Sequence, residues 1–431
     1  MAERPAPRAV VTGIGLVTPL GRDVGEFFHA LCAPRSGLVR PPAGHVAAGL
    51  VDAVGLAVEV DPASVLPRHD VPVADRFSVM AVAAADDAIT DAGIKIGEDV
   101  DAVRTAVVIS SGAGGMQTFE RQSLAMGDRG VTGVTSYLYA GFLPNMSAAR
   151  IAIKYGIRGF SSAISTACSA SAHAVAEALR LISADEADVV VCGGTEASLG
   201  ATGIAGFRNA RALAKGWDDP TLASRPFDKR RNGFVLGEGG AVLVVERADL
   251  ADARGASGYA DLTGWGSTTD AYHLVMPNPD GQSVADCMRM ALARAGVAAR
   301  EVGYVNAHGT ATRIGDMAEA RGIQQVFGDE QPPVSSTKGV TGHLLGGAGA
   351  MEAAATVLAL VHGQLPPTHN LDEPDERCRL HHIRGTSRRA RPGVAVSNSS
   401  AFGGHNVSLV FEPASTRRRR ADERTGGCAA S

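Results

Sequence analysis

Residues 160–182 read FSSAISTACSASAHAVAEALRLI and combine a reactive side chain with a change of secondary structure. Ile164–Ala167 is typical of the end of a buried strand. From Ala170 to Ile182 there is no Gly or Pro, and the apolar residues recur at helical spacing, which predicts a helix. Cys168 is therefore expected where a strand passes into a helix.

The start of a helix favours a negatively charged thiolate at Cys168. The first backbone N–H groups of a helix lack partners, and the helix dipole is positive at that end. A cysteine in this setting typically has a pKa below its usual value of about 8.5, which makes it a nucleophile at neutral pH. A single cysteine is more often a small buried apolar residue, so the expectation of reactivity depends on the rest of the sequence.

Length and composition exclude several classes of protein. The chain has 431 residues, a net charge of -4 and 20% charged residues, which is ordinary for a globular protein and gives no sign of nucleic-acid binding. The six cysteines contain no CxxC pair, so neither a metal site nor a disulfide framework is indicated. We find no signal-peptide core and no stretch with the roughly 18 apolar residues of a membrane helix. We expect a cytoplasmic protein without membrane contact.

Strands, small-residue turns and helices alternate in both halves of the chain. Strands are expected at 8–15, 103–110, 187–192, 234–246, 258–267, 302–306, 333–336, 394–397 and 407–411. The clearest helices are expected at 75–93, 145–155, 283–295, 314–327 and 345–362. This alternation predicts a layered α/β fold with reactive groups at the strand ends. We expect an N-terminal half at 1–255, a C-terminal half at 256–413 and a disordered tail at 414–431.

Three further stretches place reactive side chains at such strand ends. They are VNAHGTAT at 305–312, TKGVTGHLLGGAGAME at 337–352 and NSSAFGGH at 398–405. Each has an ordinary structural explanation, such as a hydrogen-bonded loop histidine or a surface lysine. Together with Cys168 they match nucleophilic thiol catalysis, in which one cysteine works with histidines far away in sequence. The GxSxG, GxxxxGK[ST] and HExxH motifs of other enzyme classes are absent.

The stretches TACSASA, NAHGTAT, TKGVTGHLLGGAGAMEA and NSSAFGGHN together resemble the elongating 3-oxoacyl-ACP synthases of the thiolase-like superfamily, which includes type II polyketide ketosynthases. The resemblance runs from about Arg8 to about Pro413. It implies a five-layered αβαβα fold made of two similar halves and an obligate dimer. It also implies a β-ketoacyl-ACP synthase that condenses malonyl-ACP with a Cys-bound acyl chain, with loss of carbon dioxide, in fatty-acid or polyketide elongation. No cofactor is implied beyond the phosphopantetheine of the acyl carrier protein.

The resemblance also implies catalytic roles. Cys168 would carry the acyl chain as a thioester. His308 and His343 would stabilise the enolate that remains when malonyl-ACP loses carbon dioxide. The backbone N–H groups of Cys168 and Phe402 would form a second oxyanion hole, and the Phe402 side chain would gate the site.

Further residues would support these groups. Lys338 and Glu352 would form an ion pair that orients the His343 loop. Asp316 and Glu319 would be structural acids on the helix after His308. Thr310 and Thr312 follow His308 in the same loop. Two basic side chains are candidates for docking an acidic carrier protein: Arg76 and Arg211.

Some residues depart from the family pattern. Phe160 occupies a usual proline position, and the run from Ala170 to His173 is unusual. Gln117 and Glu120 lie in the segment that crosses the dimer interface in this family. A homodimer and a heterodimer with a chain-length-factor-like subunit therefore both stay open. Two alternative functions are a non-catalytic chain-length partner, which typically lacks the nucleophile, and a CoA-dependent thiolase, which uses a cysteine in place of one histidine.

Overall fold

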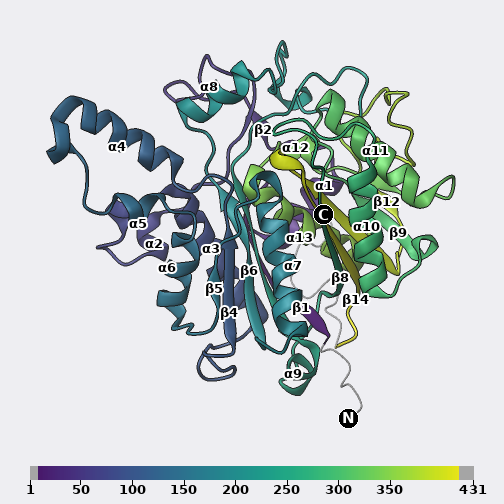
Figure 1. Ribbon diagram of the computed structural model, residues 1–431, viewed down its shortest axis with the longest axis horizontal. Helices are drawn as coiled ribbons and strands as arrows, with labels where there is room; N and C mark the ends of the chain where they lie inside the picture. The colour runs from purple at the N-terminus through teal and green to yellow at the C-terminus, as the bar shows by residue number, and fades with distance from the viewer. Residues whose placement is uncertain (1–7, 417–431) are drawn as a thin grey trace, which may run out of the picture.

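Two five-stranded sheets with the same design form the frame of the protein in this computed structural model, which describes residues 8–416 (Figure 1). The first sheet has the order β5-β4-β6-β7-β1, and the second has the order β10-β9-β13-β14-β8. The strands of the first are β1 (Ala9–Val17), β4 (Thr105–Ser110), β5 (Ser161–Ser162), β6 (Val189–Glu196) and β7 (Gly239–Arg247). Those of the second are β8 (Ala260–Thr269), β9 (Val302–Asn306), β10 (Val334–Ser335), β13 (Val394–Ser400) and β14 (His405–Pro413).

Strand directions repeat between the two sheets. In the first, β4 is parallel to β5 and β6, and β6, β7 and β1 are successively antiparallel. In the second, β9 is parallel to β10 and β13, and β13, β14 and β8 are successively antiparallel. A short antiparallel pairing of β1 with β8 joins them into one ten-stranded sheet. The expected α/β fold of two similar halves is therefore confirmed.

Helices form three layers around the two sheets. The central layer consists of α7 (Ala170–Ser183) and α13 (Ala348–His362), which contact each other and strands of both sheets (Figure 1). The outer face of the first sheet carries α3 (Arg76–Ala92) and α6 (Met146–Tyr155). On the other side of the molecule, α10 (Gln282–Ala295) packs on β8 and β14 and also contacts α11 (Arg313–Phe327). These layers give the five-layered αβαβα arrangement.

The remaining elements connect these layers or cover the strand ends. The helices are α1 (Val24–Cys32), α2 (Pro62–Val65), α4 (Met116–Arg129), α5 (Leu138–Phe142), α8 (Ala201–Asn209), α9 (Ala248–Ala253) and α12 (Lys338–Thr341). The short strands are β2 (Leu38–Val39), β3 (Val54–Gly55), β11 (Gln364–Leu365) and β12 (Arg388–Arg389). In Figure 1, α4 extends away from the sheets.

The central helix α13 is buried on every side because both sheets pack against it. All residues from Ala348 to Ala359 are buried, and most are small. By length and composition, Leu345–His362 could cross a membrane, but 83% of this segment is buried inside the protein. The expectation that no stretch has this character is wrong, because the space between two sheets demands a similarly apolar helix.

Two sequence expectations fail at their boundaries. Ile164–Ala167 is not a buried strand: only Ser161–Ser162 pairs with β4, and the N–H of Ile164 donates to the Ser110 hydroxyl instead of to a neighbouring strand. The tail does not begin at residue 414, since Ala414 and Thr416 are buried and the N–H of Ser415 donates to Asp261. The rest of the expected tail lies outside the described residues.

Glycines allow α3 to lie directly on β1. A Cβ atom on Gly15 would lie 1.9 Å from the carbonyl oxygen of Ala84, and one on Gly13 would lie 2.1 Å from that of Ala88. Both obstacles are helix backbone atoms, which cannot rotate away. Helix and strand would have to separate to accommodate any larger residue.

We expect Gly15→Ala to lower the free energy of unfolding by about 1–3 kcal/mol, because the overpacked strand must move away from α3. Urea denaturation followed by circular dichroism measures this. Gly393→Ala, at an exposed position before β13, is the control, since a Cβ there meets no atom within 4 Å. Equal stability of Gly15→Ala and the unchanged protein would contradict the close packing of α3 on β1.

Candidate active site

The nucleophile lies in a tight turn that leads into a central helix. Cys168 is the middle residue of the 3-10 turn η3 (Ala167–Ser169), which continues directly into α7. Ala167 has a φ of +49°, a left-handed conformation that is costly for a residue with a Cβ. The turn is closed because the N–H and hydroxyl of Ser169 both donate to the carbonyl of Thr166, at 3.2 and 2.9 Å. Cys168 thus precedes the helix, as the sequence predicts.

The thiol of Cys168 is protonated at neutral pH. Burial raises the pKa of Cys168 to about 12, although Lys338 and the N–H groups of Phe402 and Cys168 itself lower this pKa. The buried carboxylate of Glu196 acts in the opposite direction and raises the pKa further. The expectation of a pKa below about 8.5 is therefore wrong, because desolvation outweighs the favourable groups around the sulfur.

Two histidines from the second half of the chain lie in the same pocket as the thiol. His308 follows β9, and His343 follows α12; their ring centroids are 5.3 Å apart and the rings are nearly perpendicular. Together with Cys168 they line a pocket of about 540 Å³. The fold thus brings together three residues that are far apart in the sequence.

Both imidazole rings are neutral. Burial and the positive charge of Lys338 hold the pKa values of His308 and His343 well below the usual value, and His343 further lowers the pKa of His308. A neutral ring carries one N–H donor and one acceptor nitrogen. Each histidine can therefore offer one hydrogen bond to a developing negative charge in the pocket.

Lys338 determines which nitrogen of His308 carries its proton. The ammonium group donates to the carbonyl of His308 at 2.6 Å and to Glu352, and lies 3.4 Å from Nδ1 of His308. Because an ammonium group can only donate, Nδ1 must accept, and the ring proton is on Nε2. The Lys338–Glu352 ion pair was expected to orient the His343 loop, but the side chain of Lys338 contacts His308 directly. Burial raises the pKa of Glu352 to about 7, while Lys338 lowers it.

Two further buried acids hold the His308 loop. Glu319 accepts the N–H groups of His308 and Gly309, each at 2.7 Å. Asp316 accepts the N–H of Phe227 at 2.7 Å and lies 3.3 Å from Nε of Arg231. Burial raises the pKa of Glu319 to about 7 and that of Asp316 to about 6, and hydrogen bonds from the backbone oppose both shifts. Both acids lie on α11 and fix the backbone around the site.

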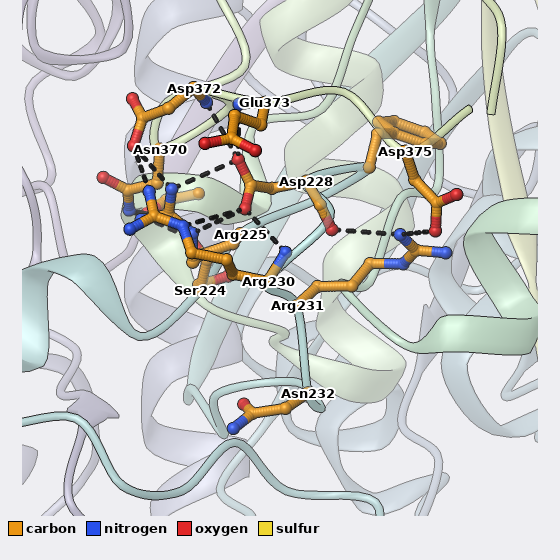
Figure 2. A network of polar contacts seen from close by, with 12 residues as sticks. Ser224, Arg225, Asp228, Arg230, Arg231, Asn232, Asn370, Asp372, Glu373 and Asp375 are labelled. Carbon is orange, nitrogen blue, oxygen red and sulfur yellow. Dashed lines mark hydrogen bonds and ion pairs between the residues drawn. The ribbon is translucent and has the colours of Figure 1, made fainter. Parts of the chain in front are cut away.

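Two buried arginines, Arg225 and Arg231, belong to a network of polar contacts that Figure 2 shows. Arg225 forms ion pairs with Asp228 and Asp372, and Arg231 forms one with Asp375 at 2.7 Å. The same segment reaches the site, because the hydroxyl of Ser224 donates to the carbonyl of Lys338 at 2.6 Å. Sequence analysis did not assign these roles; the dense charges of SRPFDKRRN at 224–232, one acid among four basic residues, were the available signal.

Phe402 lies at the boundary between the thiol and solvent. It begins the turn η7 (Phe402–Gly404), its side chain is 37% exposed, and its N–H is one of the groups that lower the pKa of Cys168. Its ring centroid is 6.1 Å from that of Phe207. Thr310 and Thr312 line the same pocket, with their hydroxyl oxygens 3.1 Å apart.

The two docking candidates have different surroundings. Arg76 forms ion pairs with Glu238 at 2.7 Å and Glu59 at 3.0 Å, and its side chain is only 25% exposed. Arg211 is exposed, lines the pocket and forms no ion pair within residues 8–416. Arg211 also has a φ of +56°, an uncommon backbone conformation for a residue with a side chain. The structure thus leaves Arg211, rather than Arg76, free to meet a partner.

The chemistry of the pocket follows from these groups. A thiol, two neutral imidazole rings and two backbone N–H groups converge in a largely apolar cavity. Within the described part of the chain, no group of three or more His, Cys, Asp or Glu side chains is placed to hold a metal ion. The arrangement can form a thioester and can stabilise an oxyanion at two places.

Known sequences match this chain along almost its entire length. Residues 6–251 match the family described as "Beta-ketoacyl synthase, N-terminal domain", and residues 259–372 match "Beta-ketoacyl synthase, C-terminal domain". A curated relative is "3-oxoacyl-[acyl-carrier-protein] synthase 2" of Synechocystis sp.. It is 40% identical over 415 residues, which cover 96% of this chain and 99% of the relative.

Solved structures are also similar. A ketosynthase titled "type II PKS acyl-carrier protein in complex with its ketosynthase bound to the hexaketide" gives a TM-score of 0.88 at 30% identity. "The ishigamide ketosynthase/chain length factor" gives a TM-score of 0.87 at 32% identity. Each alignment covers 94% of this chain and 99% of the solved chain.

We expect the alkylation of Cys168 by iodoacetamide to speed up about tenfold per pH unit from pH 7 to pH 10. The thiolate is the reacting form, and its fraction keeps rising until the pH reaches the raised pKa of Cys168. Peptide mass spectrometry would measure the modification of Cys168 alone. A blocked model peptide with one cysteine, whose pKa is about 8.5, is the control, and its rate levels off above about pH 9. A plateau for Cys168 below pH 9 would contradict the raised pKa.

Proposed function

Because this chain belongs to the beta-ketoacyl synthase family, we propose that it joins an acyl group held on Cys168 to malonyl-ACP, releases carbon dioxide and forms 3-oxoacyl-ACP. The observation that carries this proposal is the convergence of Cys168, His308 and His343 in one pocket. The acyl carrier protein delivers both substrates on its phosphopantetheine arm, and no other cofactor takes part.

The first half-reaction transfers the acyl group. The sulfur of Cys168 attacks the thioester carbonyl of acyl-ACP. The oxyanion of the tetrahedral intermediate accepts hydrogen bonds from the backbone N–H groups of Cys168 and Phe402. When the intermediate collapses, the bond to the phosphopantetheine sulfur breaks. That sulfur leaves with the proton that Cys168 gave up. A protonated resting thiol is compatible with this exchange, because one thiol is consumed and another is released.

The second half-reaction forms the carbon–carbon bond. Malonyl-ACP loses carbon dioxide, and the electron pair of the broken bond stays on the remaining thioester, which becomes an enolate. The enolate oxygen accepts hydrogen bonds from the ring N–H groups of His308 and His343. The enolate carbon attacks the acyl-Cys168 carbonyl, and the Cys168 thiolate leaves and takes up a proton from solvent. Neutral histidines suit this step because decarboxylation itself generates the carbanion, so no strong base is required.

We also propose that the carrier protein docks beside Arg211. A second hollow of about 690 Å³ shares Arg211 and Lys215 with the substrate pocket and is also lined by Arg40 and Arg208. No ion pair engages these four side chains within residues 8–416. Unpaired cations at the mouth of a pocket favour an acidic partner and speed its encounter. Arg76, which is engaged in internal ion pairs, is not part of this docking surface.

A subunit interface is proposed around α4 and β5. Large apolar side chains are exposed there, and β5 is the last strand of the sheet in the part of the chain that the structure describes. These side chains are Phe119, Leu124, Met126, Val131, Tyr137, Tyr139, Ile153 and Phe160. Such a face fits a second ketosynthase-like subunit, either another copy of this chain or a chain-length-factor-like partner, in a dimer that works in the cytoplasm.

Two other functions find less support. A non-catalytic chain-length partner would not need the nucleophile, yet Cys168 shares its pocket with both histidines. A CoA-dependent thiolase would use a second cysteine as its acid and base where this chain has a histidine. Among residues 8–416, no other cysteine lines the pocket.

We expect the purified chain, mixed with malonyl-ACP and acyl-ACPs, to give a 3-oxoacyl-ACP two carbons longer, detected by intact-mass spectrometry. Cys168→Ala should abolish this product because no thioester can form. Light scattering on the same sample would show whether the active species is a dimer of this chain. Full condensation by Cys168→Ala would contradict the proposal, and loading without product would indicate a missing partner subunit.

For the docking surface, we expect the double substitution Arg211→Glu and Lys215→Glu to raise the KM for malonyl-ACP about tenfold, with kcat within about twofold. The loss should shrink at high salt, since it is electrostatic. Arg300→Glu is the control, because Arg300 is exposed near the start of β9, at the opposite end from His308. If Arg300→Glu raised the KM for malonyl-ACP as much as the double substitution does, a docking surface confined to Arg211 and Lys215 would be contradicted.

A further inference from the structure

His173 forms a bridge between the two halves of the protein, close to the nucleophile. It lies in the first turns of α7, five positions after Cys168. Its Nδ1 is 2.8 Å from the hydroxyl of Thr166, and its Nε2 is 2.9 Å from the hydroxyl of Ser267 in β8. Both ring nitrogens are thus engaged, one by a residue of the N-terminal half and one by a residue of the C-terminal half.

The ring of His173 is neutral, so one of its nitrogens donates a hydrogen bond and the other accepts one. Burial lowers the pKa of His173 to about 4; the Ser169 carbonyl opposes this shift, and the nearby His405 adds to it. Nδ1 also faces the carbonyl oxygen of Ser169 at 3.3 Å, and a carbonyl can only accept. The ring proton is therefore on Nδ1, and Nε2 accepts the hydroxyl proton of Ser267.

At one end, the bridge holds the nucleophile turn. Thr166 is the residue before Ala167, whose left-handed backbone must be maintained by its surroundings. The carbonyl of Thr166 accepts hydrogen bonds from the N–H and the hydroxyl of Ser169. The hydroxyl of Thr166 forms a hydrogen bond with His173. Loss of His173 would remove the hydrogen bond to the Thr166 hydroxyl, the contact that links this turn to Ser267 through the ring of His173.

At the other end, the bridge holds the strands that carry Phe402. Ser267 pairs with Val407 of β14, and β14 begins directly after the Phe402 turn. The carbonyl of Gly404, the last residue of that turn, accepts the N–H of Asp270 at 2.9 Å. Both β8 and β14 therefore connect Ser267 to the backbone that presents the N–H of Phe402.

We propose that His173 is a positioning residue that sets the separation between the backbone N–H groups of Cys168 and Phe402, and so forms the oxyanion hole for acyl transfer. This inference rests on the proposed function. The Cys168 N–H is held by the turn at one end of the bridge, and the Phe402 N–H by the strands at the other. A small change in their separation weakens a hydrogen bond to the oxyanion.

The proposal separates the two half-reactions. His308 and His343, which bind the malonyl enolate, are held by Glu319, Lys338 and the backbone of Val235, and none of these contacts His173. Loss of the bridge should therefore damage acyl transfer to Cys168 much more than the decarboxylation of malonyl-ACP. A merely structural contribution of His173 would lower both rates together.

The test compares these rates in His173→Ala and Ser267→Ala. Acyl loading of Cys168 is measured by intact mass with acyl-ACP, and carbon dioxide release is measured with malonyl-ACP alone. We expect loading to slow about 10- to 100-fold while carbon dioxide release stays within about twofold. Ser267→Ala removes one hydroxyl and keeps the ring, so it remains informative if His173→Ala does not fold.

His362→Ala is the matched control. Its ring stacks on Phe28 at 4.7 Å, at the end of α13, and its loss should lower the melting temperature without changing the ratio of the two rates. Equal losses of both rates in the bridge variants, or no loss of loading, would overturn the role of His173. If the protein without any substitution neither loads Cys168 nor releases carbon dioxide, the proposed function is overturned, and the inference with it.

Discussion

The side chain of Lys338 is 1% exposed, and its buried positive charge organises the site around it. Such a charge is tolerated only with close partners, and here they are Glu352 and the carbonyl oxygen of His308. In return it fixes the tautomer of His308. Together with burial, which is the larger cause, it lowers the pKa values of His308 and His343 and keeps both rings neutral. Glu352 lies on the central helix α13, so the electrostatics of the site depend on the correct packing of the five layers.

The division of the chain into two halves explains how the site is assembled. Cys168 comes from the first half, at the start of α7, and both histidines come from the second. The two meet because α7 and α13 approach closely between the sheets: a Cβ on Gly349 would lie 2.6 Å from that of Ala172, and the hydroxyl of Ser171 accepts the N–H of Ala350 at 3.0 Å. The unusual small residues after Cys168 are therefore explained by this helix contact.

Much of this could be predicted from the sequence, because the relevant signals are local. The helix after Cys168, the strands before His308 and Phe402, and the two similar halves were all expected. The pKa of Cys168 was not, since burial depends on residues from many segments, including Leu345 and Phe234. The surroundings of Arg76 were missed for the same reason: its partner Glu238 is 162 positions away. Ile164–Ala167 was misjudged because a side-chain hydroxyl, which periodicity does not reveal, ends the pairing there.

The late position of α13 in the chain has a consequence for folding during synthesis. All five strands of the first sheet and α7 leave the ribosome before Ala348, where α13 begins. Until then, the inner face of the first sheet lacks half of its helical cover, and apolar side chains such as Leu243 and Val245 remain open to other nascent chains. The first sheet is therefore fully covered only when α13 has been made, and apolar surface exposed until then promotes aggregation.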